Sequence, residues 1–239
     1  MNTIEIQEEI CVITLNNKPN NYLERPEFVS VIELQKKVLE HACKAIIIRG
    51  AGRHFSAGAD VEQMRKMVNQ DSIIAEMTKG KELLAAMQSF NIPIVTAVEG
   101  VCFGGGLEIV LASDIRIASS KCLFAFPEAN LELIPGLGGT IHLPKYSGIA
   151  RSLEMILKGD IIDCQTAHDI DIIDFVVDAK TTFDFAMKML SSMVKNRSMS
   201  VIKAVVESVR NAESKPYAEA LARETELFCE LAKNAVEDE

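Results

Sequence analysis

The pattern of hydrophobic and polar positions changes along the chain from strands, through strand–helix units, to helices alone. Residues 3–7 and 10–15 are rich in Ile and Val and lie close together, a pattern that predicts a β-hairpin. A turn-forming segment follows, and Pro26 then predicts the start of a helix that runs to about His41. Residues 73–89 show the hydrophobic spacing of a second amphipathic helix.

Short hydrophobic runs between glycine-containing segments predict the buried strands of an α/β body. These runs cover residues 45–48, 92–98, 114–118 and 123–126. From Thr181 to the end the spacing predicts helices, with a break near residues 214–216. We therefore expect an α/β body over residues 1–178 and a helical C-terminal region over residues 179–239.

Composition and charge narrow the possible functions of this body. Hydrophobic residues make up 48% of the 239 residues, which is enough for a sizeable core. The net charge of −9 and the lack of a basic cluster argue against nucleic acid as a partner. No hydrophobic run has the length of a membrane span and no secretory signal is visible, so we expect a cytoplasmic protein. The six cysteines are scattered without ligand spacing, which favours reduced core cysteines over a metal site.

The segment Gly104-Gly105-Gly106 lies between a predicted strand and a predicted helix, and Glu108 follows on the first helical turn. Consecutive glycines leave the backbone uncovered, so that a ligand can approach an amide N–H. An accessible N–H beside a carboxylate can hold an oxyanion while a proton moves. The same glycines could instead permit close packing of helix on strand. Their spacing does not match a dinucleotide-binding motif.

Three further segments could carry chemistry, and each also has a purely structural interpretation. In residues 57–60, small side chains leave the Ala59 N–H accessible, while Asp60 could cap the next helix. Glu128 follows aromatic residues and a proline, surroundings that raise a carboxyl pKa, although a loop glutamate is often solvated. Residues 135–140 form a second glycine-rich turn, which could cradle a ligand or simply begin a helix.

Taken together and in this order, the segments resemble the crotonase superfamily, which includes the enoyl-CoA hydratases. The resemblance runs from about residue 10 to about residue 230, and its motifs lie within residues 50–61, 91–114 and 124–140. It implies an α/β fold built as a spiral of ββα units, with two roughly perpendicular sheets flanked by helices. It also implies a helical C-terminal part that forms a homotrimer, which in many relatives pairs into a hexamer.

The resemblance also implies a role for each motif. The N–H groups of Ala59 and Gly105 would form an oxyanion hole for a thioester carbonyl, Glu108 would activate water, and Glu128 would protonate the α-carbon. Substrate contacts would come from neighbouring residues, namely Ala57, Gly58, Asp60, Gly104, Pro135, Gly136 and Gly138. Coenzyme A would enter as part of the substrate, so that no separate cofactor and no metal is expected.

Three departures from the family pattern concern the ADP half of coenzyme A. Glu62 stands where many relatives carry a lysine, and residues 20–23 differ from the usual LNAL segment. The sequence ends at residues 234–239, where we expect the family's final helix to be missing. Cations that could replace the missing ones, or could be ordinary surface charges, are Arg53, Arg65 and Lys66.

We therefore expect a lyase that hydrates a 2-enoyl-CoA thioester reversibly, as in fatty acid metabolism. One alternative is a dehydratase, decarboxylase or double-bond isomerase. It could act on an acyl-CoA or on an acyl-carrier-protein thioester, as in polyketide biosynthesis. Another alternative is a thioester-binding protein without chemistry, since fold alone does not fix activity. The presence of two carboxylates, Glu108 and Glu128, favours hydration.

Overall fold

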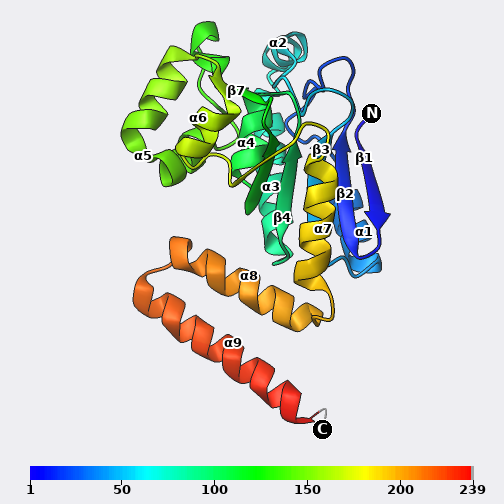
Figure 1. The fold of residues 1–239 in the computed structure, drawn as a ribbon. Helices are drawn as coiled ribbons and strands as arrows, with labels where there is room; N and C mark the ends of the chain where they lie inside the picture. Colours follow the sequence, from blue (N-terminus) through cyan, green and yellow to red (C-terminus); the bar gives the residue numbers. More distant parts are fainter. Residues whose placement is uncertain (238–239) are drawn as a thin grey trace.

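The computed structural model describes residues 1–237, which form two β-sheets surrounded by helices (Figure 1). The larger sheet has the strand order β1-β2-β3-β4-β6-β9. Its strands are β1 (Thr3–Gln7), β2 (Ile10–Leu15), β3 (Ala45–Gly50), β4 (Ile94–Val98), β6 (Ile115–Ser119) and β9 (Phe175–Val177). Only β1 and β2 pair antiparallel, and each later neighbouring pair is parallel.

The smaller sheet has the order β5-β7-β8 and combines parallel and antiparallel pairing. It comprises β5 (Val101–Phe103), β7 (Leu123–Ala125) and β8 (Ile162–Asp163). Both β5 and β7 end directly before segments with candidate chemistry, because β5 leads to the triple glycine and β7 leads to Glu128.

The helices cover the larger sheet on both faces. The helices of the described residues, including those that lie elsewhere, are α1 (Val31–Glu40), α2 (Val61–Asn69), α3 (Ile73–Ser89), α4 (Gly105–Leu111), the 3₁₀ helix η1 (Pro127–Leu131), α5 (Gly139–Lys158), α6 (Cys164–Asp169), α7 (Thr182–Val194), α8 (Met199–Ser214) and α9 (Tyr217–Glu237). Helix α7 packs against β3, β4 and β6, while α1 and α3 lie on the opposite face (Figure 1).

The centre of the larger sheet forms the core. Ile46, Ile47 and Ile48 of β3 are all fully buried, although successive side chains of a strand point to opposite faces. Helices therefore cover both faces of this parallel region, which explains a continuous hydrophobic run in place of alternation.

Two of the predicted elements are confirmed closely, namely the N-terminal hairpin and the helix over residues 73–89. The predicted helix start at Pro26 is wrong, because α1 begins only at Val31. Ser30 is the residue that caps α1, since its side chain accepts a hydrogen bond from the Glu33 N–H. Strands β5, β8 and β9 and helix α6 had no separate signal in the sequence, and all are six residues or shorter.

The C-terminal helices extend away from the sheets (Figure 1). Helix α8 packs on α9, and the predicted break falls between them, at residues 215–216. The expectation that all six cysteines are core residues is wrong for Cys229, which is exposed on α9. Cys229 is exposed because α9 packs on α8 and much of its remaining surface faces solvent. The domain division after residue 178 stays a prediction.

Residues 1–237 lack two classes of feature, a membrane-crossing helix and a cluster of metal ligands. None of the helices in this range combines the length and the hydrophobicity that crossing a membrane would require. The described residues also include no group of three or more His, Cys, Asp or Glu side chains placed to hold a metal ion.

Candidate active site

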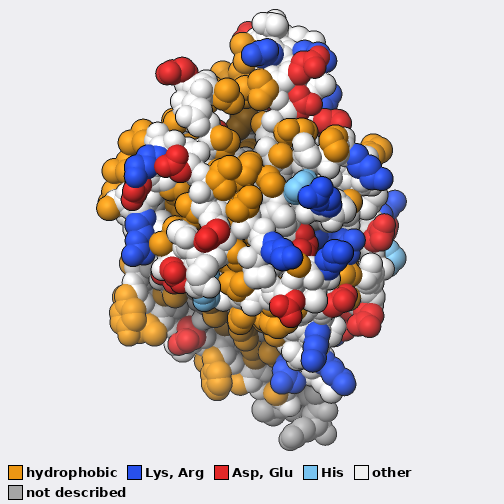
Figure 2. All heavy atoms as spheres, turned by 45° about the horizontal axis from the view of Figure 1, so that its top comes forward, with side chains coloured by type: hydrophobic (Ala, Val, Ile, Leu, Met, Phe, Trp, Pro, Cys, Tyr) orange, Lys and Arg blue, Asp and Glu red, His pale blue; other side chains and the backbone are white. Residues whose placement is uncertain are grey.

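A mostly hydrophobic cavity of about 250 Å³ lies beneath α2, between the loops that follow β3, β5 and β7. Figure 2 shows hydrophobic side chains gathered around a hollow on the face that carries α2. The cavity is lined by Leu23, Glu24, Pro26, Ala59, Asp60, Met64, Met67, Ile73, Met77, Gly105, Glu108, Glu128, Leu133, Ile134, Gly136 and Leu137. Segments far apart in the sequence thus bring two backbone amides and two glutamates to one space.

Ala59 and Gly105, the residues predicted to form the oxyanion hole, both line the cavity. Within the described part of the chain, neither N–H has a hydrogen-bond partner. The Ala59 segment is fixed by a short parallel bridge to Leu23, whose N–H donates to the Gly58 carbonyl at 2.8 Å. Gly105 is the first residue of α4, where an N–H has no partner inside the helix. Two unpaired N–H donors in one cavity can stabilise an oxyanion.

Glu108 lies on α4 and is 2% exposed. Its Oε1 accepts hydrogen bonds from the N–H of Leu137 at 2.6 Å and of Gly139 at 2.7 Å. Burial raises the pKa of this carboxyl above its ordinary value, and the backbone N–H donors oppose that rise. The second glycine-rich turn therefore serves to hold Glu108, a role that goes beyond starting α5.

Glu128 lies on η1 and is half-buried. Burial, with a smaller contribution from the charge of Glu108, raises its pKa to about 7. Its Oε2 is buried and has no partner within the described residues. Gly104 makes room for the carboxyl, because a Cβ there would lie 2.6 Å from Glu128 Oε1. Glu128 is therefore poised to gain or lose a proton near neutral pH.

Comparison with known proteins places this chain in a family. A sequence model described as enoyl-CoA hydratase/isomerase matches residues 5–238. A probable enoyl-CoA hydratase of Bacillus subtilis (strain 168) is 32% identical over 231 residues, which cover 95% of this chain and 89% of that protein. The 2,3-dehydroadipyl-CoA hydratase of Escherichia coli (strain K12) is 29% identical, covering 97% of this chain and 89% of the relative.

Solved structures agree with the sequence comparison. The crystal structure of an enoyl-CoA hydratase from Bacillus anthracis superposes with a TM-score of 0.83 at 25% identity, covering 95% of this chain and 89% of that chain. The chain belongs to the enoyl-CoA hydratase/isomerase family. It has the family's crotonase fold, with two sheets and C-terminal helices, and it is an enoyl-CoA hydratase-like enzyme that acts on acyl-CoA thioesters.

The predicted site residues of this crotonase-fold enzyme fall into two groups. Those on the cavity lining are Ala59, Asp60, Gly105, Glu108, Glu128 and Gly136. Those that do not line it are Ala57, Gly58, Gly104, Pro135 and Gly138. Two members of the second group have a structural role. Gly104 makes room for Glu128, and Gly138 has a φ of 111° directly before α5. Asp60 also caps α2, as the sequence suggested.

Three methionines line the cavity, and the sequence did not predict them as site residues. Met64 and Met67 come from α2, and Met77 comes from α3. The available signal was their helical spacing. That spacing is equally typical of a helix face packed on a core, so it could not assign them to a cavity.

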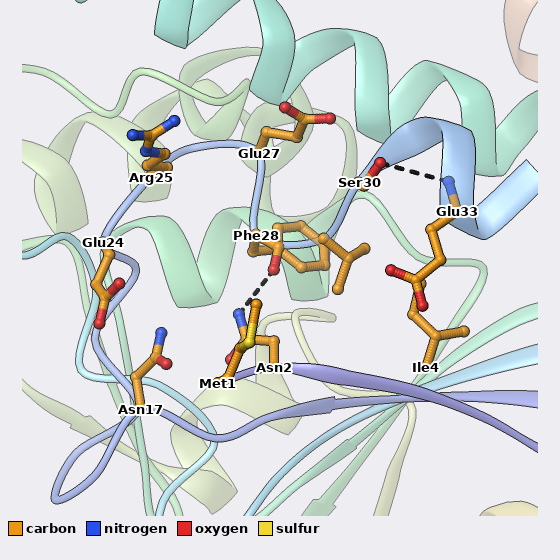
Figure 3. A pocket seen from close by; sticks show the side chains of 11 residues that line it. Met1, Asn2, Ile4, Asn17, Glu24, Arg25, Glu27, Phe28, Ser30 and Glu33 are labelled. Atoms are coloured by element: carbon orange, nitrogen blue, oxygen red, sulfur yellow. Dashed lines mark hydrogen bonds between the residues drawn. The ribbon is translucent and has the colours of Figure 1, made fainter.

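A second hollow, of about 520 Å³, lies beside the N-terminus of this enoyl-CoA hydratase-like chain (Figure 3). Its charged lining residues are Glu24, Arg25, Glu27 and Glu33. Asn2 in this hollow donates a hydrogen bond from Nδ2 to the Phe28 carbonyl at 2.7 Å. This hollow is larger than the cavity beneath α2, but its lining includes neither Glu108 nor Glu128.

Two of the cations considered as partners of the coenzyme A phosphates have other neighbours. Lys66 forms an ion pair with Glu62 on the same helix, with Nζ and Oε1 3.3 Å apart. Arg53 lines a separate hollow of about 410 Å³, together with Arg49, Lys121 and Lys180. None of these cations lines the cavity beneath α2.

Proposed function

We propose that the enzyme adds water reversibly across the double bond of a 2-enoyl-CoA thioester, with Glu108 and Glu128 as its catalytic residues. One observation carries the proposal: two carboxylates in different environments share a cavity with the Ala59 and Gly105 N–H groups, which have no partner among residues 1–237. Hydration of an enoyl thioester needs this combination, because it places negative charge on the carbonyl oxygen and moves two protons.

The reaction proceeds by conjugate addition. Glu108 accepts a proton from water, the hydroxyl oxygen bonds to the β-carbon, and the double-bond electrons move onto the thioester oxygen. The N–H groups of Ala59 and Gly105 stabilise this oxyanion, and a donor of this kind contributes about 3–4 kcal/mol. Glu128 then gives its proton to the α-carbon as the carbonyl re-forms. Glu108 ends protonated and Glu128 ionised, so that one proton must pass between them, through solvent, before the next turnover.

The environments of the two acids support this division of roles. A pKa near 7 leaves a large fraction of Glu128 protonated at neutral pH, as a proton donor requires. Glu108 accepts two backbone hydrogen bonds, which favour its charged form and fix the carboxylate that must receive the proton of water.

We also propose that the chain forms a homotrimer, or a hexamer of two trimers, through its exposed helices. Large hydrophobic side chains lie open on α8 and α9, including Val209, which is 67% exposed, and Phe228, which is 70% exposed. Burial of such residues against a second copy stabilises an assembly by about 25 cal/mol per Å² of apolar surface. Light scattering coupled to size-exclusion chromatography should give three or six times the 26.3 kDa chain mass.

The reaction is tested with crotonyl-CoA in water labelled with ¹⁸O. We expect 3-hydroxybutyryl-CoA that carries the label on its hydroxyl, with kcat/KM of about 10⁴ M⁻¹s⁻¹ or more. A product with a shifted double bond and no label would indicate an isomerase, and loss of CO₂ from a carboxylated thioester would indicate a decarboxylase. Turnover only of a crotonyl group attached to an acyl carrier protein would show that the carrier protein, and not coenzyme A, presents the acyl group to the enzyme. If none of these substrates is converted, the remaining interpretation is a thioester-binding protein without chemistry.

A further inference from the structure

The residues that line the cavity indicate which acyl groups it can accept, an inference that rests on the proposed function. Outside the proposed catalytic groups, the cavity wall consists mainly of hydrophobic side chains, three of them methionines. Its volume of about 250 Å³ lies below the ~300–1,000 Å³ of pockets that enclose drug-sized ligands. The cavity therefore has room for an acyl group, while most of a coenzyme A molecule would lie outside it.

The charges on the described lining are all of one sign. Its acidic residues are Glu24, Asp60, Glu108 and Glu128, and the lining includes no Lys, Arg or His. Lys81 lowers the pKa of Glu108 electrostatically, but it is not on the lining. An acyl group that ends in a carboxylate would meet like charges and a hydrophobic wall without a cation. Burying an unpaired charge in such a place is strongly unfavourable.

One methionine of the cavity wall lies beside the turn that holds the proposed water base. A Cβ at Gly136 would lie 2.5 Å from Met77 Cε, so the Met77 methyl lies directly against this glycine. Gly136 precedes Leu137, whose N–H holds Glu108. Met77 therefore lies on the cavity wall beside the turn that holds Glu108, and Met64 and Met67 line the same cavity from α2.

Helix α2 packs only lightly on the rest of the protein, through contacts with α3. None of its residues is buried, and Met64 and Met67 are half-exposed toward the cavity. Methionine is unbranched and adapts to irregular hydrophobic surfaces. A hydrocarbon chain in the cavity would add hydrophobic contact to Met64 and Met67 on this side of α2.

We propose that the cavity selects unsubstituted hydrocarbon acyl groups over acyl groups that end in a carboxylate, and that Met77, seated against Gly136, limits the acyl chain length. Met77 is thereby a specificity-determining residue. The rejected class includes 2,3-dehydroadipyl-CoA, which gives the Escherichia coli relative its name.

The first test compares two substrates with six-carbon acyl groups that differ at the far end, hex-2-enoyl-CoA and 2,3-dehydroadipyl-CoA, on the wild-type enzyme. We expect kcat/KM to favour the hydrocarbon on the order of 100-fold. Equal rates, or a preference for the carboxylated substrate, would overturn the selectivity while leaving the proposed function intact. Hydration of neither substrate would overturn the proposed function, and this inference with it.

The second test measures kcat/KM along a series from crotonyl-CoA through hex-2-enoyl-CoA to dec-2-enoyl-CoA. Met77→Ala should raise the value for decenoyl relative to crotonyl about tenfold, because it opens the path. Gly136→Ala should lower the same ratio, because the added methyl pushes Met77 into the cavity. Met193→Ala, at a methionine on α7 that is 44% exposed and not on the lining, is the matched control. An unchanged ratio in both active cavity variants would exclude Met77 as the determinant.

Discussion

Glu108 and Glu128 enter one cavity from two regions that surround a carboxyl group differently. Every residue of α4 is buried, and Glu108 there accepts two backbone N–H bonds. The 3₁₀ helix η1 has no buried residue, yet Glu128 Oε2 is itself buried and has no partner among the described residues. Burial raises the pKa of both groups, but only Glu108 has strong backbone donors from a second element to offset it.

The contrast shows how one fold can give two glutamate side chains different chemical roles. Donors supplied by a distant turn fix Glu108 and favour its charge, which suits a base. Burial, without such donors from a second element to offset it, raises the pKa of Glu128 to about 7, which suits a group that gives and regains a proton. Two substitution experiments and one pH titration test the contrast, from the largest expected effect to the smallest.

Glu128→Gln removes the exchangeable proton while keeping the shape of the side chain. We expect kcat for crotonyl-CoA hydration to fall about 10³-fold, within the range for loss of a general acid or base. Glu132→Gln is the matched control, since Glu132 is exposed directly after η1 and should leave kcat within about twofold. Steady-state kinetics on both variants decides the point, and a Glu128→Gln enzyme as fast as wild type would rule out the mechanism.

Glu108→Ala leaves the N–H groups of Leu137 and Gly139 without an acceptor in a buried site. The free energy of unfolding should fall by about 2–4 kcal/mol, because each unsatisfied buried donor costs about 1–3 kcal/mol. Glu108→Gln keeps an acceptor oxygen and should lose less stability, although both variants should lose hydration activity. Urea unfolding of the two variants gives the comparison. Equal stability of the two would show that these hydrogen bonds do not fix Glu108.

The pH dependence of stability gives the smallest effect. The pKa of Glu128 rises from 4.5 in the unfolded chain to about 7 in the folded one, so the folded state binds more protons between these values. The stability from Glu128 is therefore fully present below about pH 4.5 and is lost as pH rises through about 7.

At ~1.4 kcal/mol per pKa unit, this change amounts to at most ~3 kcal/mol. Urea unfolding of wild type and Glu128→Gln across this pH range isolates it, because the difference between the two proteins cancels the other groups. A difference that stays constant with pH would place Glu128 in contact with water.

Much of the framework was predictable because its signals are local. The hairpin and the helix over residues 73–89 follow from hydrophobic periodicity, and Asp60 follows from the chemistry of a helix cap. The start of α1 was misplaced, because Pro26 gives a strong local signal whereas the residue that caps the helix is Ser30. Cys229 was misplaced because hydrophobic composition does not reveal that α9 lies away from the sheets.

The sequence by itself determined the family motifs: the order of the glycine segments, the two glutamates and the hydrophobic strands that precede them. Tertiary structure decided which of these groups meet. The bond from Leu137 to Glu108 spans 29 residues, and Met77 meets Gly136 only because α3 packs beside the turn before α5. Local patterns record backbone preference and burial. The proton affinity of Glu128 and the shape of the cavity depend instead on neighbours that the packed fold supplies.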